Sequence, residues 1–183
     1  MAKLFLRIII YKSLDNFLIK HISESIGQRL AGTSTLSQIA QIVTNLEHFQ
    51  IACTELERSL TSLRFVSITM SNISRHKTDW LLVRSAQRGG IISLNASTSF
   101  AATLSRALER ITGLITSKLD DFFELSEYDW TPKSREDSPS MYLYELVNWL
   151  TTVVDSLVIK DAYKDEAYKG AVAYIADCFM VKF

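Results

Sequence analysis

Glycine and proline are scarce in this chain, with six glycines and two prolines among 183 residues. A many-stranded sandwich or barrel needs such residues at its hairpins and corners, because they accommodate the backbone angles of tight turns. Their scarcity argues against an all-β architecture and favours long helices. Cysteine is scarce too: Cys53 and Cys178 lie far apart and form no Cys-x-x-Cys pair, which argues against a disulfide framework or a zinc site.

The sequence also lacks a long, uninterrupted apolar run. The apolar segment that starts at Leu4 is interrupted by Arg7 and ends at Lys12, so it is far shorter than the roughly 20 residues needed to cross a bilayer. No small-residue cleavage site follows it, so it does not match a secretory signal peptide. We therefore expect a cytoplasmic protein.

An excess of charge of one sign is absent, because 20 basic residues balance 20 acidic ones. The halves differ: residues 1–90 hold 11 Lys and Arg against 6 Asp and Glu, whereas residues 91–183 hold 9 against 14. A net charge of zero argues against sequence-independent nucleic-acid binding, which depends on neutralising phosphates. The asymmetry can steer a charged partner, although solvated helix faces explain it more simply.

The sequence does contain apolar residues at helical spacing. These stripes predict helices over residues of about 4–30, 35–71 and 96–128, which we expect to form one helical bundle over residues 1–130. In the second stripe the apolar positions advance by fewer than 3.5 residues per turn, so either different faces are buried at its two ends or the helix curves. The three stripes are Leu14, Leu18, Ile22 and Ile26; Leu36, Ile39, Val43, Leu46, Phe49, Cys53, Leu56, Leu60 and Leu63; and Phe100, Leu104, Leu108, Ile111, Ile115, Leu119 and Phe122.

A polar stretch that contains Pro132 divides the chain, and we interpret residues 131–138 as a linker. Ser138 and Pro139 then match the N-cap and first residue of a new helix. Residues 139–183 are predicted to start a second helical bundle, which is incomplete in this chain. The predicted fold class is therefore all-α, an elongated stack of long antiparallel helices. The stripes of this second part are Leu143, Leu146, Leu150, Val153, Val154 and Leu157, and then Tyr163, Ala167, Ala171, Tyr174, Ile175 and Cys178.

The sequence shows no pattern typical of catalysis or metal binding. His21, His48 and His76 fall in different elements, without the spacing of a helical zinc site. Five acidic residues between Asp120 and Asp129 share one helix, whereas the carboxylate ligands of a divalent cation converge from several directions. We predict no catalytic, metal or cofactor site and no enzymatic activity. A helical-bundle enzyme assembled from scattered polar residues is the alternative in that class.

One connection, residues 72–95, is distinctly basic. It raises the alternative that the chain is an unrelated helical adaptor or regulator, whose cations and indole ring contact nucleic acid or anionic lipid. Trp80 is followed by three apolar residues, which favours docking of this segment on the protein's own helices instead. The residues concerned are Arg75, His76, Lys77, Trp80, Arg84 and Arg88.

Two stretches near the linker carry a family resemblance. The first reads Lys118-Leu-Asp-Asp-Phe-Phe-Glu-Leu-Ser-Glu-Tyr-Asp-Trp-Thr131, and the second reads Tyr142-Leu-Tyr-Glu-Leu-Val-Asn-Trp-Leu150. Together they resemble the exocyst complex component six family, the exocyst subunit that receives Rab GTPases. A looser similarity extends back through residues 36–60 and fades in the basic connection 72–95. Members of that family are several times longer, so the chain is expected to represent part of one.

The resemblance implies stacked helical bundles of the helical-rod type found in tethering complexes, and no catalysis. It implies a subunit that helps to tether secretory vesicles to the plasma membrane, with other exocyst subunits and a GTP-loaded Rab GTPase as expected partners. No nucleic-acid partner and only an indirect membrane association are expected. The expected location is cytoplasmic, peripheral at secretory vesicles and sites of exocytosis. We interpret Tyr128-Asp129-Trp130 as a structural corner, and no partner-binding residue is assigned.

Overall fold

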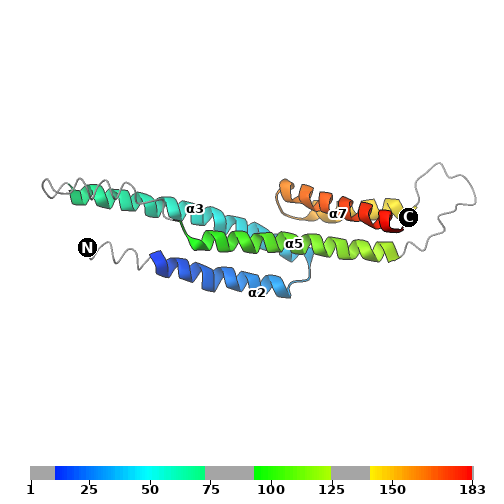
Figure 1. Ribbon diagram of the computed structural model, residues 1–183, viewed down its shortest axis with the longest axis horizontal. Helices are drawn as coiled ribbons and strands as arrows, with labels where there is room; N and C mark the ends of the chain where they lie inside the picture. The colour runs from blue at the N-terminus through cyan, green and yellow to red at the C-terminus, as the bar shows by residue number, and fades with distance from the viewer. Residues whose placement is uncertain (1–10, 73–92, 125–140, 183) are drawn as a thin grey trace, which may run out of the picture. The chain divides into compact units, whose positions relative to one another are not determined.

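The computed structural model describes residues 11–72, 93–124 and 141–182, and their side chains within 11–61, 93–123 and 141–178. Every element in these ranges is helical, which confirms the predicted all-α fold class. The helical stretch 11–17 is followed by η1 (Leu18–Ser23), α2 (Glu24–Gly32), α3 (Leu36–Asn72), α5 (Asn95–Glu124), α6 (Met141–Ser156) and α7 (Asp161–Lys182) (Figure 1).

The chain forms two compact units, each built from separate stretches of sequence. Unit 1 combines Met1–Gln28 with Leu46–Thr103, and unit 2 combines Arg29–Asn45 with Leu104–Phe183. Helices α2, α3 and α5 therefore each contribute residues to both units. The predicted linker 131–138 lies outside the described residues, and the division into bundles 1–130 and 139–183 stays a prediction.

The N-terminal helix of unit 1 contains a π-helical turn, η1. Its defining wide hydrogen bond runs from the backbone N–H of Glu24 to the carbonyl oxygen of Ile19. A π turn contains an additional residue, so it changes which side chains share a face. The predicted apolar stripe from Leu14 to Ile26 is accordingly only half-buried, whereas the polar residues Asp15 and Ser23 are buried.

In unit 1, the part of α3 that follows Leu46 runs antiparallel to the start of α5. The Phe49 and Phe100 rings stack with their centroids 5.3 Å apart, and eight residues further along α3 Glu57 meets Leu94, just before α5 begins. Hydroxyl groups join the N-terminal helix to α5, since the Ser23 and Ser99 oxygens lie 2.7 Å apart. The buried apolar residues of unit 1 are Leu46, Cys53, Leu94, Ala96 and Phe100.

Unit 2 is built around the second part of α5, whose predicted apolar stripe is buried except at Leu108 and Phe122, which are half-buried. At the end of the stripe the buried residue is Phe123. Helix α6 reaches α5 through the Phe122 and Trp149 rings, whose centroids are 5.4 Å apart, and α7 reaches it through an edge contact between Phe123 and Tyr174. The start of α3 joins the same unit, where the Thr44 hydroxyl donates to the Val158 carbonyl oxygen (2.8 Å). The buried apolar residues of α5, α6 and the loop that follows α6 in this unit are Leu104, Ala107, Ile111, Ile115, Leu119, Phe123, Tyr142, Leu146, Leu150, Val154 and Leu157.

Small residues let α7 approach α5 closely. Only Ala167 and Ala171 are buried among the described side chains of α7. A Cβ atom placed on Gly170 would lie 3.3 Å from the Thr112 Cγ2 atom of α5, so a larger side chain here would require Thr112 to shift by a few tenths of an ångström. The larger residues of the predicted stripe, including Tyr163, Tyr174 and Ile175, are only half-buried.

This close approach predicts opposite effects for two glycine substitutions in unit 2. Gly170→Leu should lower the free energy of unfolding by about 1–3 kcal/mol, because overpacking forces the two helices apart. Gly113→Leu is the matched control, since nothing lies within 4 Å of a Cβ atom there. It should raise the free energy of unfolding by about 0.5–1 kcal/mol through helix propensity. Urea denaturation measures both; equal effects would contradict close packing at Gly170.

Candidate functional site

The most buried acidic group of unit 1 caps a helix distant from it in sequence. Asp15 is only 5% exposed, and its carboxylate accepts hydrogen bonds from the backbone N–H groups of Asn95 (3.3 Å) and Ala96 (2.8 Å). It also accepts one from the Asn95 side-chain amide (2.9 Å). The first N–H groups of a helix have no partner within the helix and carry partial positive charge, so a carboxylate there stabilises α5.

A second carboxylate supports the same helix start. Glu57 of α3 accepts a hydrogen bond from the backbone N–H of Leu94 (2.6 Å), and the Tyr11 hydroxyl donates to the carbonyl oxygen of Ser93. Residues 93–96 are thus held from two sides, by the N-terminal helix and by α3. Because these acids already accept hydrogen bonds from the protein's own backbone, we read the cluster as a structural cap.

The Cys53 thiol, which is buried in unit 1, is poorly suited to react. Burial, followed by the charges of Glu57 and Asp15, raises the pKa of the Cys53 thiol above its usual 9.0. The thiolate is the reactive form, so a raised pKa leaves less of it near neutral pH. Burial and the same two carboxylates, Asp15 more than Glu57, also raise the pKa of Tyr11.

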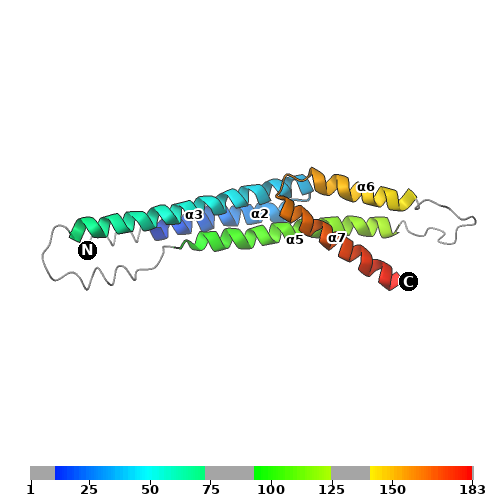
Figure 2. The ribbon, with the colours of Figure 1, turned by 90° about the horizontal axis from the view of Figure 1, so that it is seen from above.

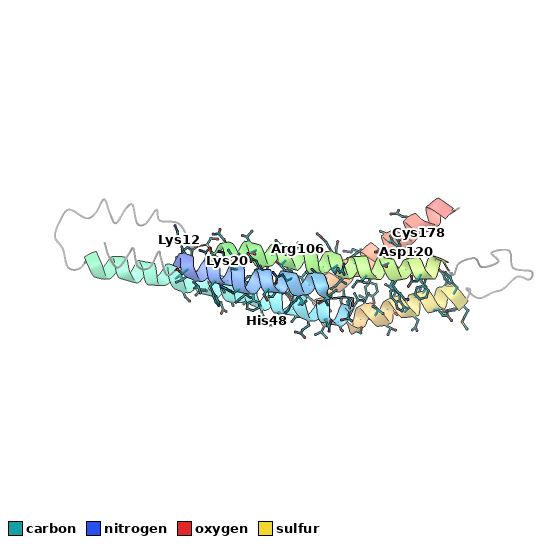
Figure 3. The ribbon with its side chains drawn as sticks, turned by 90° about the horizontal axis from the view of Figure 1, so that it is seen from below. Lys12, Lys20, His48, Arg106, Asp120 and Cys178 are labelled. Atoms are coloured by element: carbon teal, nitrogen blue, oxygen red, sulfur yellow. The ribbon has the colours of Figure 1, made fainter. Side chains whose placement is uncertain are left out.

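The structure describes two of the three histidines, and these lie on different helices. The His21 ring packs against Phe17 with a centroid distance of 5.1 Å, and His48 is exposed on α3. His76 lies outside the described residues, as do the basic connection's other charged residues and Trp80. Figure 3 shows that Lys12 and Lys20 belong to the N-terminal helix and His48 to α3.

The acidic stretch of α5 makes contacts with the protein itself. Asp120 accepts a hydrogen bond from the Tyr174 hydroxyl of α7, and Asp121 forms an ion pair with Lys118 (2.8 Å). Figure 3 shows Asp120 on α5 and Cys178 on α7. No group of three or more residues able to hold a metal ion occurs in the described part of the chain. Glu127, Asp129 and the Tyr128-Asp129-Trp130 corner lie outside it.

Two tyrosine–aspartate pairs connect the helices of unit 2. The hydrogen bond to Asp120, together with burial, raises the pKa of Tyr174. Burial and the hydrogen bond to Asp155 (2.9 Å) raise the pKa of Tyr168, and burial alone raises that of Tyr142. A tyrosine with a raised pKa stays protonated as a hydrogen-bond donor near neutral pH, so the Tyr168 and Tyr174 hydroxyls can keep donating the bonds that link the helices.

The remaining notable feature is apolar surface. Large apolar side chains stand exposed on α6, where the exposed fractions are 70% for Met141, 57% for Tyr144 and 55% for Val147, and on α7, where Val172 is 59% exposed. Apolar groups grouped on neighbouring helices mark surfaces that bind proteins or membranes. None of the described helices combines the length and apolarity that a membrane crossing requires. The described surface therefore favours binding over chemistry.

Comparison with known proteins adds the family context. The sequence model of the family described as exocyst complex subunit Sec15 C-terminal matches residues 5–183. Exocyst complex component 6 of Mus musculus and of Homo sapiens are each 27% identical to this chain over 118 residues. The exocyst complex component sec15 of Schizosaccharomyces pombe is 30% identical over 118 residues.

These matches cover 64% of this chain but only 12% of the length of the mouse and human proteins and 14% of the yeast protein. The chain thus corresponds to a small part of the curated relatives it matches. No solved structure matches it.

The helix cap predicts a measurable loss when its carboxylate is removed. Asp15→Ala should lower the free energy of unfolding by about 1–3 kcal/mol, because the buried N–H groups of residues 95 and 96 lose their acceptor. Amide hydrogen exchange at Ala96 should accelerate. Asn16→Ala, at the exposed neighbouring position, is the control and should change stability by less than about 0.5 kcal/mol. Unchanged exchange at Ala96 would contradict the capping role.

The raised pKa of Cys53 predicts slow thiol chemistry. In a Cys178→Ser variant, Ellman's reagent should react with Cys53 roughly ten-fold more slowly in the folded chain than in urea at about pH 8. The midpoint of the rate against pH should lie above 9.0 in the folded state only. The Cys53→Ser variant, which keeps Cys178, provides the comparison. Equal folded and unfolded rates for Cys53 would show that its thiol is accessible.

Proposed function

Because this chain belongs to the exocyst complex subunit Sec15 C-terminal family, we propose that it acts as a non-catalytic helical segment of an exocyst subunit. Its role would be to bind other subunits of the complex, and so to help tether secretory vesicles to the plasma membrane. The observation that carries the proposal is the family match, which leaves out only the first four residues of the chain.

The described structure supports a binding role in two ways. Its buried carboxylate Asp15 caps a helix, its buried thiol Cys53 has a raised pKa, and its acidic residues on α5 pair within the molecule. By contrast, α6 and α7 carry exposed apolar side chains, namely Met141, Tyr144, Val147 and Val172. Helices that bury one face and present another are suited to packing against helices of a partner.

We propose further that the chain binds a Rab GTPase in its GTP-loaded state. The expected location follows from it: cytoplasmic, and peripheral at secretory vesicles and sites of exocytosis. A direct membrane contact and a nucleic-acid contact are not part of this proposal. The alternative of a basic adaptor depends on residues between 72 and 95, of which 73–92 lie outside the described structure, and nothing in the described residues favours it.

Affinity capture tests the proposal directly. The full chain, immobilised and incubated with an extract of eukaryotic cells at physiological salt, should retain named exocyst subunits, identified by mass spectrometry. An all-α protein of similar size and zero net charge serves as the control for unspecific retention. If exocyst subunits are retained no better than on the control, the proposed subunit role is wrong.

The Rab contact needs a separate measurement. Rab GTPases loaded with a non-hydrolysable GTP analogue should bind the chain several-fold more tightly than the same proteins loaded with GDP, because the γ-phosphate orders their switch segments. Equal binding in the two nucleotide states would remove the Rab from the proposal and leave the subunit role untouched.

A further inference from the structure

The N-terminal helix of unit 1 contacts α5 at two places, one on each side of the π turn η1. Asp15, before η1, accepts hydrogen bonds from the backbone N–H groups of Asn95 (3.3 Å) and Ala96 (2.8 Å). Ser23, the last residue of η1, holds its hydroxyl oxygen 2.7 Å from that of Ser99. Within unit 1 the N-terminal helix runs alongside α5 (Figure 2). One face of this helix therefore presents both Asp15 and Ser23.

A regular α-helix does not place these two residues on one face. Successive residues of an α-helix are about 100° apart, so a step of eight residues ends roughly 80° away from its starting direction. The wide turn η1, in which the backbone N–H of Glu24 bonds to the carbonyl oxygen of Ile19, takes up one additional residue. The eight residues then rotate like seven, and a step of seven ends within about 20° of its start.

The burial of the side chains agrees with this geometry. Asp15 and Ser23 are 5% and 2% exposed, and Ile19, midway between them, is half-buried. Phe17 and His21 are exposed and stack with their ring centroids 5.1 Å apart. The π turn thus keeps one side of residues 15–23 against α5 and the other side outward.

The π turn depends on its contacts with α5. The π geometry is rare in proteins and occurs mostly as single turns inside α-helices. A helix that loses the contacts requiring the additional residue returns to the α-helical pattern, in which the Glu24 N–H bonds to the carbonyl oxygen of Lys20. The bonds of Asp15 and Ser23 lie on opposite sides of η1 and require that residue together. Each bond therefore supports the other through the turn.

We propose that η1 is a two-state register device. While Asp15 and Ser23 are both bonded to α5, the turn is a π turn. When either bond is lost, it becomes an α turn, and residues 11–17 rotate by roughly 80° relative to Ser23. Asp15 then leaves the start of α5, and the outward position of Phe17 changes with it. The register change belongs to unit 1 and holds whether or not the chain binds exocyst subunits.

Deletion of one residue from the full chain tests whether η1 contains an additional residue. Lys20 is exposed within η1, and without it seven residues separate Asp15 from Ser23. The shortened helix should be a regular α-helix that keeps both bonds, so amide hydrogen exchange at Ala96 should stay within about three-fold of the native rate. A shortened chain that does not fold, or whose Ala96 exchanges ten-fold faster, would overturn the proposal.

Deletion of Ala52 is the matched control. Ala52 is also exposed, but it lies in the α-helical part of α3 between Phe49 and Glu57, both of which contact residues at the start of α5. No additional residue exists there, so the deletion rotates Glu57 away and should accelerate exchange at Leu94 at least roughly ten-fold. Equal tolerance of the two deletions would overturn the proposal, because tolerance at Lys20 would then not reflect an additional residue.

Ser23→Ala tests the coupling between the two bonds. It removes the hydroxyl contact with α5 and should accelerate exchange at Ala96 roughly five-fold, because the cap is released as the turn converts. In the chain that lacks Lys20 the same substitution should change this rate by less than about two-fold, since no π turn remains to convert. Ser25→Ala, at an exposed position outside η1, should leave the rate within about two-fold in both chains. Equal acceleration by Ser23→Ala with and without Lys20 would overturn the proposal.

The acceptor of the Glu24 N–H group distinguishes a register change from general loosening. NMR scalar coupling across the hydrogen bond should connect the Glu24 nitrogen to the carbonyl carbon of Ile19 in the native chain. In Ser23→Ala it should connect that nitrogen to the carbonyl carbon of Lys20. If the coupling to Ile19 persists in Ser23→Ala, the turn does not convert and the proposal is wrong.

Discussion

The start of α5 depends on two carboxylates supplied by other helices. Asp15 and Glu57 accept the backbone N–H groups of residues 94–96, so the N-terminal helix and α3 of unit 1 are both fixed to the same turn of chain. The stacked Phe49 and Phe100 rings and the Ser23–Ser99 contact then lie further along the same helices. Without the cap, the leading N–H groups of α5 would be buried with no acceptor. The start of α5 would then no longer be fixed to the N-terminal helix and to α3.

In unit 2, two helices, α6 and α7, pack against a single helix, α5. Ala167, Gly170 and Ala171 let α7 come close to α5, while α6 uses larger residues such as Trp149 and Leu150. Helices seated through side chains of unequal size need not run alongside each other, and this is consistent with the divergence of α6 and α7 (Figure 2).

Much of the fold could be predicted from the spacing of apolar residues, because one-sided burial of a helix leaves a period near 3.6 in the sequence. The predicted stripe of α5, from Phe100 to Phe122, is buried except at Leu108 and Phe122, which are half-buried. The sliding stripe of α3 matches a helix whose two ends lie in different units. The burial of Asp15 could not be predicted, because its partner lies 80 residues away and the π turn that orients this helix leaves no periodic signal.

The sharing of α3 and α5 between the units also determines how this chain can be divided. Each unit consists of two separate stretches of sequence, and their three boundaries fall inside helices, at residues 28–29, 45–46 and 103–104. A cut at any of these boundaries would create new helix ends with four unbonded N–H or C=O groups each. Neither unit can therefore be excised or transplanted as a module, and insertions during evolution would be tolerated between the helices rather than between the units.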